Sequence, residues 1–141
     1  MARRPRQYNA KAGWRTIGGQ RCYFRSKSEA NAARYLQWLV DRGEVVGWRH
    51  EMTTFWFDGI KRGVRSYMPD FYVIPTQSTE PSYYVEVKGY LDAKSKTKLK
   101  RMAKYHPDVK VELWDAKRMA GLTRTVGPLI QDWEYNQGDT Q

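Results

Sequence analysis

The chain has 141 residues, a formal net charge of +10 and a single cysteine. This length suits one domain with its own core, and one cysteine excludes an internal disulfide framework. No apolar stretch approaches the length of a membrane span or of a secretory signal, so we expect a soluble, cytoplasmic protein. The positive charge predicts a polyanionic partner, most simply nucleic acid. With two histidines and one cysteine, the sequence offers no zinc-ligand set.

Both ends of the chain differ in composition from its middle. Residues 1–21 are basic and poor in aliphatic side chains, which predicts a flexible arm. Its cations can contact phosphates or simply form a solvated tail; those we assign to nucleic-acid binding are Arg3, Arg4, Arg6, Lys11 and Arg15. Residues 130–141 are polar and slightly acidic and are expected to fray. Residues 22–129 are therefore the expected folded domain.

The first predicted helix begins after Ser26 and ends before Gly43. Glu29 is expected on its inward face, together with Leu36. Two interpretations remain open for this carboxylate. It can complete a capping box by accepting from the Ser26 backbone N–H, or it can reach inward to a metal site.

A predicted edge strand over residues 44–49 is followed by a predicted hairpin. Residues 53–57 run into the turn signal Asp58-Gly59, and a basic segment returns from it. Arg62 and Arg65 in that segment can hold a phosphate backbone, although an ordinary solvated hairpin fits the pattern equally well.

Two further predicted strands, residues 67–74 and 83–89, carry charge among apolar residues. Asp70 lies at the start of the first strand, and Glu86 and Lys88 project from one side of the second. Such charges are costly in a core unless they pair or bind a metal. The combination suits a Mg²⁺-dependent phosphodiesterase. The alternative is a surface salt bridge between Glu86 and Lys88 on an edge strand.

A basic helix is predicted over residues 92–105, and a strand over residues 109–114 follows it. Leu99, Met102 and Ala103 form its apolar seam. Crowded cations make contact with DNA more plausible than a purely structural role; those assigned to binding are Lys94, Lys96, Lys98, Lys100 and Arg101. The order of elements predicts an α/β domain with a mixed β-sheet flanked by helices on both sides.

These residues together resemble the PD-(D/E)XK nuclease superfamily. The resemblance spans roughly residues 23–114 and rests on Glu29 in a helix, on Pro69-Asp70, and on Glu86-Val87-Lys88 before a basic helix. Within the superfamily the sequence is most similar to small phage and archaeal Holliday-junction resolvases and related phage endonucleases. The resemblance implies a restriction-endonuclease-like core in residues 22–129 and a phage-encoded enzyme that acts on DNA in the host cytoplasm.

The expected chemistry is metal-dependent hydrolysis of phosphodiester bonds. Asp70, Glu86 and Glu29, with the backbone carbonyl of Val87, are the expected ligands of Mg²⁺, with Mn²⁺ as a possible substitute. Lys88 is expected to orient or deprotonate the attacking water, or to stabilise charge in the transition state.

Several alternatives remain open at this stage. The chain can be a sequence-specific nicking or restriction-type endonuclease, a transposase-like endonuclease, or a catalytically silent nucleic-acid-binding module of the same fold. For a resolvase, a symmetric homodimer is expected, because a junction has near two-fold symmetry. Surplus aromatic side chains are candidates for the dimer contact, namely Trp38, Trp48, Trp56 and Trp133.

Overall fold

A computed structural model describes residues 11–76 and 79–136. The elements in chain order are β1 Gly13–Ile17, β2 Gln20–Phe24, α1 Lys27–Asp41, β3 Val45–His50, β4 Phe55–Trp56, β5 Ser66–Tyr67, β6 Phe71–Pro75, β7 Tyr83–Lys88, α2 Ala93–Tyr105, β8 Val111–Asp115, α3 Ala116–Thr125 and a 3₁₀ turn, η1, Gly127–Leu129. The expected mixed α/β class is confirmed.

The central sheet has four strands in the order β3-β6-β7-β8. β6 pairs antiparallel with both β3 and β7, whereas β8 runs parallel to β7 after the crossover through α2. The sheet is therefore mixed, as predicted, and β3 lies at its edge. The expected hairpin is also present as the separate β4–β5 pair, in which Phe55 lies opposite Tyr67.

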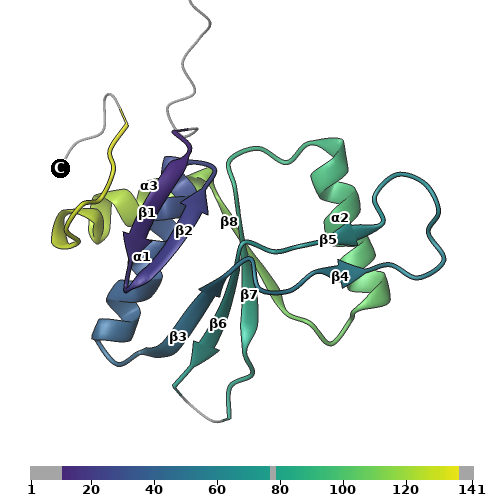
Figure 1. Ribbon diagram of the computed structural model, residues 1–141, viewed down its shortest axis with the longest axis horizontal. Helices are drawn as coiled ribbons and strands as arrows, with labels where there is room; N and C mark the ends of the chain where they lie inside the picture. The colour runs from purple at the N-terminus through teal and green to yellow at the C-terminus, as the bar shows by residue number, and fades with distance from the viewer. Residues whose placement is uncertain (1–10, 77–78, 137–141) are drawn as a thin grey trace, which may run out of the picture.

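Helices cover both faces of this sheet, with α1 and α3 on one side and α2 with the β4–β5 pair on the other (Figure 1). On the first side Leu36 of α1 packs in one buried cluster with Trp48, Phe71 and Val85 from three strands. On the second side Met102 of α2 joins a smaller cluster from the β4–β5 region. No helix among the described residues is long and apolar enough to cross a membrane.

The predicted helix boundaries are confirmed. The Ser26 hydroxyl accepts from the Glu29 backbone N–H at 3.0 Å, and Gly43 has a φ of +78°, which suits glycine after a helix end. In α2 the predicted apolar seam is partly wrong, because Ala103 is exposed. Ser95 and Met102 are the buried residues of that helix.

The N-terminal segment differs from the flexible arm that we expected. Residues 13–21 belong to an antiparallel hairpin in which Ile17 lies opposite Gln20. Gly18 and Gly19 form its two-residue turn with φ values of +59° and +80°, the conformation that a tight hairpin of this kind needs. The buried side chains of Ile17 and Phe24 join the main core. Because residues 1–21 are basic and poor in aliphatic side chains, their composition predicted a flexible arm and not this short hairpin.

Residues 130–136 pack against the folded domain, so the prediction of a frayed tail is wrong for this stretch. Trp133 is buried, and its indole N–H donates to the Thr123 hydroxyl at 3.2 Å. Asn31 of α1 exchanges two hydrogen bonds with the Glu134 backbone. A short polar segment therefore packs on α1 through specific bonds that composition alone does not reveal. Residues 137–141 lie outside the described residues.

Candidate active site

A cleft of about 560 Å³ opens at the end of the sheet, between the first turn of α1 and the start of α2. The cleft contains all four charged residues predicted for catalysis: Glu29, Asp70, Glu86 and Lys88. Its full lining is Arg25, Ser26, Ser28, Glu29, Tyr67, Met68, Asp70, Glu86, Val87, Lys88, Gly89, Tyr90 and Lys98.

Asp70 and Glu86 lie side by side because their strands are neighbours. The β6–β7 ladder pairs Phe71 with Val85, which brings the two carboxyl-bearing positions together just beyond that pair. The Asp70 side chain is buried and accepts from the Val87 backbone N–H at 2.8 Å. The Glu86 carboxylate accepts from the Tyr67 hydroxyl at 2.8 Å. Both carboxylates are thus held in fixed orientations by neutral donors.

The electrostatics of this pair favour an added cation. Burial, and then the nearby Glu86 and Glu29 carboxylates, raise the pKa of Asp70 well above its ordinary value, against the Val87 N–H and Arg25. Burial likewise raises the pKa of Glu86, although the Tyr67 hydroxyl and then Lys88 act in the opposite direction. Like charges held together out of water resist ionisation. A divalent ion would relieve that repulsion.

Glu29 combines features of both interpretations left open by its sequence position. Its side chain is buried, and Oε1 accepts from the Arg25 backbone N–H at 2.9 Å rather than from that of Ser26. This contact is displaced by one residue from a standard capping box. The other oxygen, Oε2, lies 2.5 Å from His50 Nε2. Glu29 therefore caps the N-terminus of α1 and also faces inward to the cleft.

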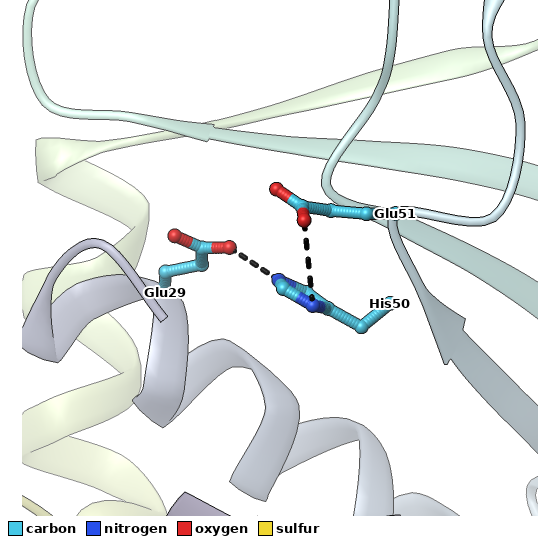
Figure 2. Close-up of side chains that lie close together, drawn as sticks. All are labelled: Glu29, His50 and Glu51. Carbon is cyan, nitrogen blue, oxygen red and sulfur yellow. Dashed lines mark hydrogen bonds and ion pairs between the residues drawn. The ribbon is translucent and has the colours of Figure 1, made fainter. Parts of the chain in front are cut away.

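Sequence reasoning missed His50 and Glu51. Figure 2 shows Glu29 and Glu51 approaching the His50 imidazole from different sides. One donor atom from each of the three residues lies within 4.8 Å of the others, a mixed nitrogen and oxygen group of a kind that can hold a metal ion. The His50 ring is fixed between the rings of Phe24 and Phe71, with centroid distances of 4.7 and 5.3 Å.

The position of Glu51 follows from sheet pairing. It is the first residue after β3, its φ is +52°, and its backbone N–H donates to the Asp70 carbonyl at 2.8 Å. A non-glycine residue at positive φ is uncommon. In the sequence, the only signal was that His50 and Glu51 directly follow a predicted strand, residues 44–49. It identifies a site residue only when the pairing of β3 with β6, the strand that follows Asp70, is known.

Arg25 is a further residue that sequence reasoning missed, and it lines the cleft itself. Its guanidinium lies 2.5 Å from Glu51 Oε2, 3.7 Å from Asp70 Oδ1 and 3.9 Å from Glu29 Oε2. Partial burial alone would lower the pKa of Arg25, but the three carboxylates together raise it above its ordinary value. The cleft thus contains a cation of the protein itself, the largely exposed Arg25 guanidinium, beside its carboxylates.

The residues predicted to bind nucleic acid divide into groups. Exposed on the surface are Lys11, Arg62, Arg65, Lys94, Lys96 and Lys100. Lys98 lines the cleft. Arg101 donates to the Val64 carbonyl of the β4–β5 loop, and Arg15 is held by Glu134 at 2.5 Å. These two arginines have structural partners. Arg3, Arg4 and Arg6 lie outside the described residues.

The donor set fits the expected metal. Asp70 and Glu86 offer hard carboxylate oxygens, which are the ligands that Mg²⁺ prefers, and Glu29 of α1 is the third carboxylate that lines the cleft. The Val87 backbone N–H is committed to Asp70; the carbonyl of Val87 as a metal ligand stays a prediction.

Comparison with protein-family models found no matching family, and comparison with curated proteins found no matching sequence.

Proposed function

We propose that this protein is a Mg²⁺-dependent DNA endonuclease of the PD-(D/E)XK type, with Mn²⁺ as an alternative ion. The observation that supports this function best is the Asp70–Glu86 pair. Two carboxyl groups with raised pKa values lie on adjacent strands in an open cleft that Lys88 also lines. Perturbed carboxyl groups beside a cation in a cleft are characteristic of catalytic sites.

In this proposal each residue of the site has a separate task. Asp70 and Glu86, with Glu29 as a third carboxylate, would hold the metal ion. The Val87 N–H and the Tyr67 hydroxyl fix the orientations of Asp70 and Glu86. When bound, Mg²⁺ would acidify the attacking water and neutralise charge on the phosphate. The Lys88 ammonium orients or deprotonates that water, or stabilises the negative charge that develops during the reaction.

The basic surface beside the cleft supports a nucleic-acid substrate. The cations of α2 include Lys98 in the cleft itself and the exposed Lys94, Lys96 and Lys100 along the helix. A phosphate backbone bound along α2 would therefore lead into the carboxylates. A catalytically silent binding module of the same fold is the alternative, but buried acids facing a polyanion would weaken such binding rather than serve it.

The proposed substrate is branched DNA, most simply a four-way junction. This choice rests on the resemblance of the motifs to junction resolvases. Sequence-specific nicking or restriction-type cleavage, and transposase-like end cutting, are the competing activities. A substrate panel separates them, because a resolvase prefers the junction whereas the others act on linear duplex.

The direct test offers the purified protein a four-way junction, a linear duplex of the same sequences and single-stranded DNA, each with Mg²⁺, with Mn²⁺ or with a chelator. We expect metal-dependent cleavage with preference for the junction. An absence of cleavage on every DNA with either metal would refute the proposed function.

Three substitutions test the assigned residues: Asp70→Asn, Glu86→Gln and Lys88→Ala. Each should reduce Mg²⁺-dependent cleavage by at least ~100-fold, because it removes a metal ligand or a charge-stabilising group. DNA binding should persist in all three variants. Asp108→Asn and Lys110→Ala are matched controls, since both residues are exposed and precede β8 at the other end of the sheet. Near wild-type cleavage by any test variant would remove that residue from the site.

A further inference from the structure

Arg25 occupies the short connection between β2 and α1, at the edge of the candidate cleft. Its backbone N–H is fixed by Glu29 Oε1 at 2.9 Å, immediately before the Ser26 cap. The side chain lines the cleft and is 61% exposed. The backbone of Arg25 is thus held in place, whereas its exposed side chain has room to change conformation.

The three carboxylate contacts of Arg25 are unequal. Nη2 is 2.5 Å from Glu51 Oε2, whereas Nη1 lies 3.7 Å from Asp70 Oδ1 and 3.9 Å from Glu29 Oε2. Only the Glu51 contact is short enough for a hydrogen bond. Nη1 therefore stands between Asp70 and Glu29 as a positive charge without satisfying either carboxylate. These are two of the side chains proposed to hold the metal ion.

A divalent ion and the guanidinium would compete for the same negative charge. An ion held by Asp70 would place two positive charges a few ångströms from Nη1, and like charges at that separation repel strongly in a partly buried site. The guanidinium can then turn outward, because most of its side chain is exposed. The group best suited to receive it there is a phosphodiester, which the planar guanidinium binds through two parallel hydrogen bonds.

We propose that Arg25 is a phosphate-binding residue of the cleft that neutralises its carboxylates before metal binds and contacts the substrate phosphodiester afterwards. This inference rests on the proposed function for the identity of the ligand. Metal binding and DNA binding are coupled through one side chain. The competition between Arg25 and the metal ion does not depend on whether DNA is cleaved.

The experiment compares Arg25→Gln and Arg25→Lys with the wild type. Arg42→Gln is the matched control, because Arg42 forms a comparable 2.7 Å ion pair with Glu44 at the other end of α1. Mn²⁺ binding without DNA is measured by the loss of the free-ion electron paramagnetic resonance signal. Binding of a labelled four-way junction is measured in Ca²⁺ as a non-cleaving substitute, and cleavage in Mg²⁺.

Arg25→Gln should bind Mn²⁺ about 3- to 10-fold more tightly than the wild type, since a competing charge is lost. The same variant should bind the junction more weakly and cleave it at least ~10-fold more slowly. Arg25→Lys keeps the charge, so its Mn²⁺ affinity should stay near wild type while junction binding falls. A merely structural role would weaken metal binding and DNA binding together.

Mn²⁺ affinity that is unchanged or weaker in Arg25→Gln overturns the competition, and unchanged junction affinity in Ca²⁺ overturns the phosphate contact. Equal effects in Arg42→Gln would also overturn the assignment, because they would reflect net charge alone. A wild-type protein that cleaves no DNA would contradict the proposed function, whereas the Mn²⁺ and Ca²⁺ measurements would still decide the role of Arg25.

Discussion

At the scale of single residues, the cleft holds its carboxylates in fixed positions before any ligand arrives. Asp70 receives the Val87 backbone N–H, Glu86 receives the Tyr67 hydroxyl and Glu29 receives the Arg25 backbone N–H. Each contact fixes one oxygen of the carboxylate. Preorganised charges of this kind need little rearrangement when a cation binds. The cost is electrostatic repulsion in the metal-free protein.

The repulsion between these carboxylates predicts how the stability of the metal-free protein depends on pH. The folded-state pKa of Asp70 lies above its ordinary value of 3.8, mainly through burial and then through Glu86. The folded state therefore binds this proton more tightly than the unfolded state, and stability is lost as pH rises from about 4 through the folded-state pKa. Asp70→Asn, which can still accept from Val87, should raise the melting temperature of the metal-free protein at pH 7.

The gain should disappear as the pH approaches 4, and Mg²⁺ should raise the melting temperature of the wild type more than that of the variant. Calorimetry with and without a chelator measures both effects. The control is Asp108→Asn, which changes an exposed carboxylate. A lower melting temperature for Asp70→Asn at pH 7 would show that Asp70 stabilises the fold as an ion.

Glu29→Gln separates the two tasks of that residue. The glutamine oxygen can still accept from the Arg25 backbone N–H, but the buried contact with His50 loses its carboxylate. We therefore expect about 1–3 kcal/mol lost from the free energy of unfolding. Cleavage should fall by at least ~100-fold if the carboxylate takes part in metal binding. Glu44→Gln, near the other end of α1, is the control. Retained cleavage in Glu29→Gln would leave Glu29 with the capping role alone.

At the scale of elements, α1 connects the cleft to the rest of the molecule. Its first turn supplies Glu29. Its following turns contact the N-terminal hairpin and Glu134 of the C-terminal segment. Glu134 bridges Arg15 of β1 at 2.5 Å and Arg34 of α1 at 2.8 Å. Burial would raise the pKa of Glu134, but the two arginines together lower it. This ionic contact fixes β1 and the segment around Glu134 on the helix that carries Glu29.

The structure therefore predicts opposite roles for two sets of cations. Arg15→Ala should lower the free energy of unfolding by about 1–3 kcal/mol and leave the salt dependence of DNA binding unchanged, because Arg15 is committed to Glu134. Lys96→Ala with Lys100→Ala on exposed positions of α2 should leave stability unchanged. This pair should flatten the log–log salt slope by up to about 1.8, since each phosphate contact contributes about 0.9.

Denaturant titration and DNA binding at several salt concentrations measure the two effects. A flatter slope in Arg15→Ala would return Arg15 to the DNA-binding set. An unchanged slope in the α2 variant would mean that the DNA follows another surface.

At the scale of the whole molecule, the burial of two tryptophans reduces the number of aromatic side chains that can form a dimer contact. Trp48 and Trp133 lie in the interior, so they are not the surplus aromatic residues that we expected at an interface. Trp38 is partly buried and stacks on Tyr35. Of the four candidates, Trp56 on β4 is the exposed one, at 62%. Trp14 on β1 is also exposed.

We expect a homodimer at micromolar concentration that cuts a four-way junction in preference to linear duplex, because paired cuts need two copies of a single site. Light scattering measures the mass. Trp56→Ala should weaken the self-association by at least ~10-fold if this ring anchors the contact, and Trp14→Ala is its control. A monomer that cuts linear duplex as readily as the junction would contradict both the dimer and the resolvase activity.

Much of the fold and the centre of the site were predictable from local pattern. Ser26 and Gly43 define α1 because capping chemistry depends on neighbouring residues. Asp70 and Glu86 stood out because charge in an apolar strand is costly wherever the strand lies. The Gly18-Gly19 turn was also a local signal, but the surrounding positive charge led to the wrong prediction of a flexible arm.

The sequence by itself determined α1, α2, the strands of the central sheet, the basic residues of α2 and the charged pair Asp70 and Glu86, but not the N-terminal hairpin or α3. Only the tertiary structure decided which distant groups come together. Arg25 lines the cleft, and His50 and Glu51 contact Glu29 and Arg25 beside it, because β3 pairs with β6 and α1 starts next to both strands. Arg15 and Glu134 form an ion pair although they are 119 residues apart in the sequence. Capping and strand alternation depend on residues a few positions apart, whereas a charge pair depends on distance in space, which chain folding alone sets.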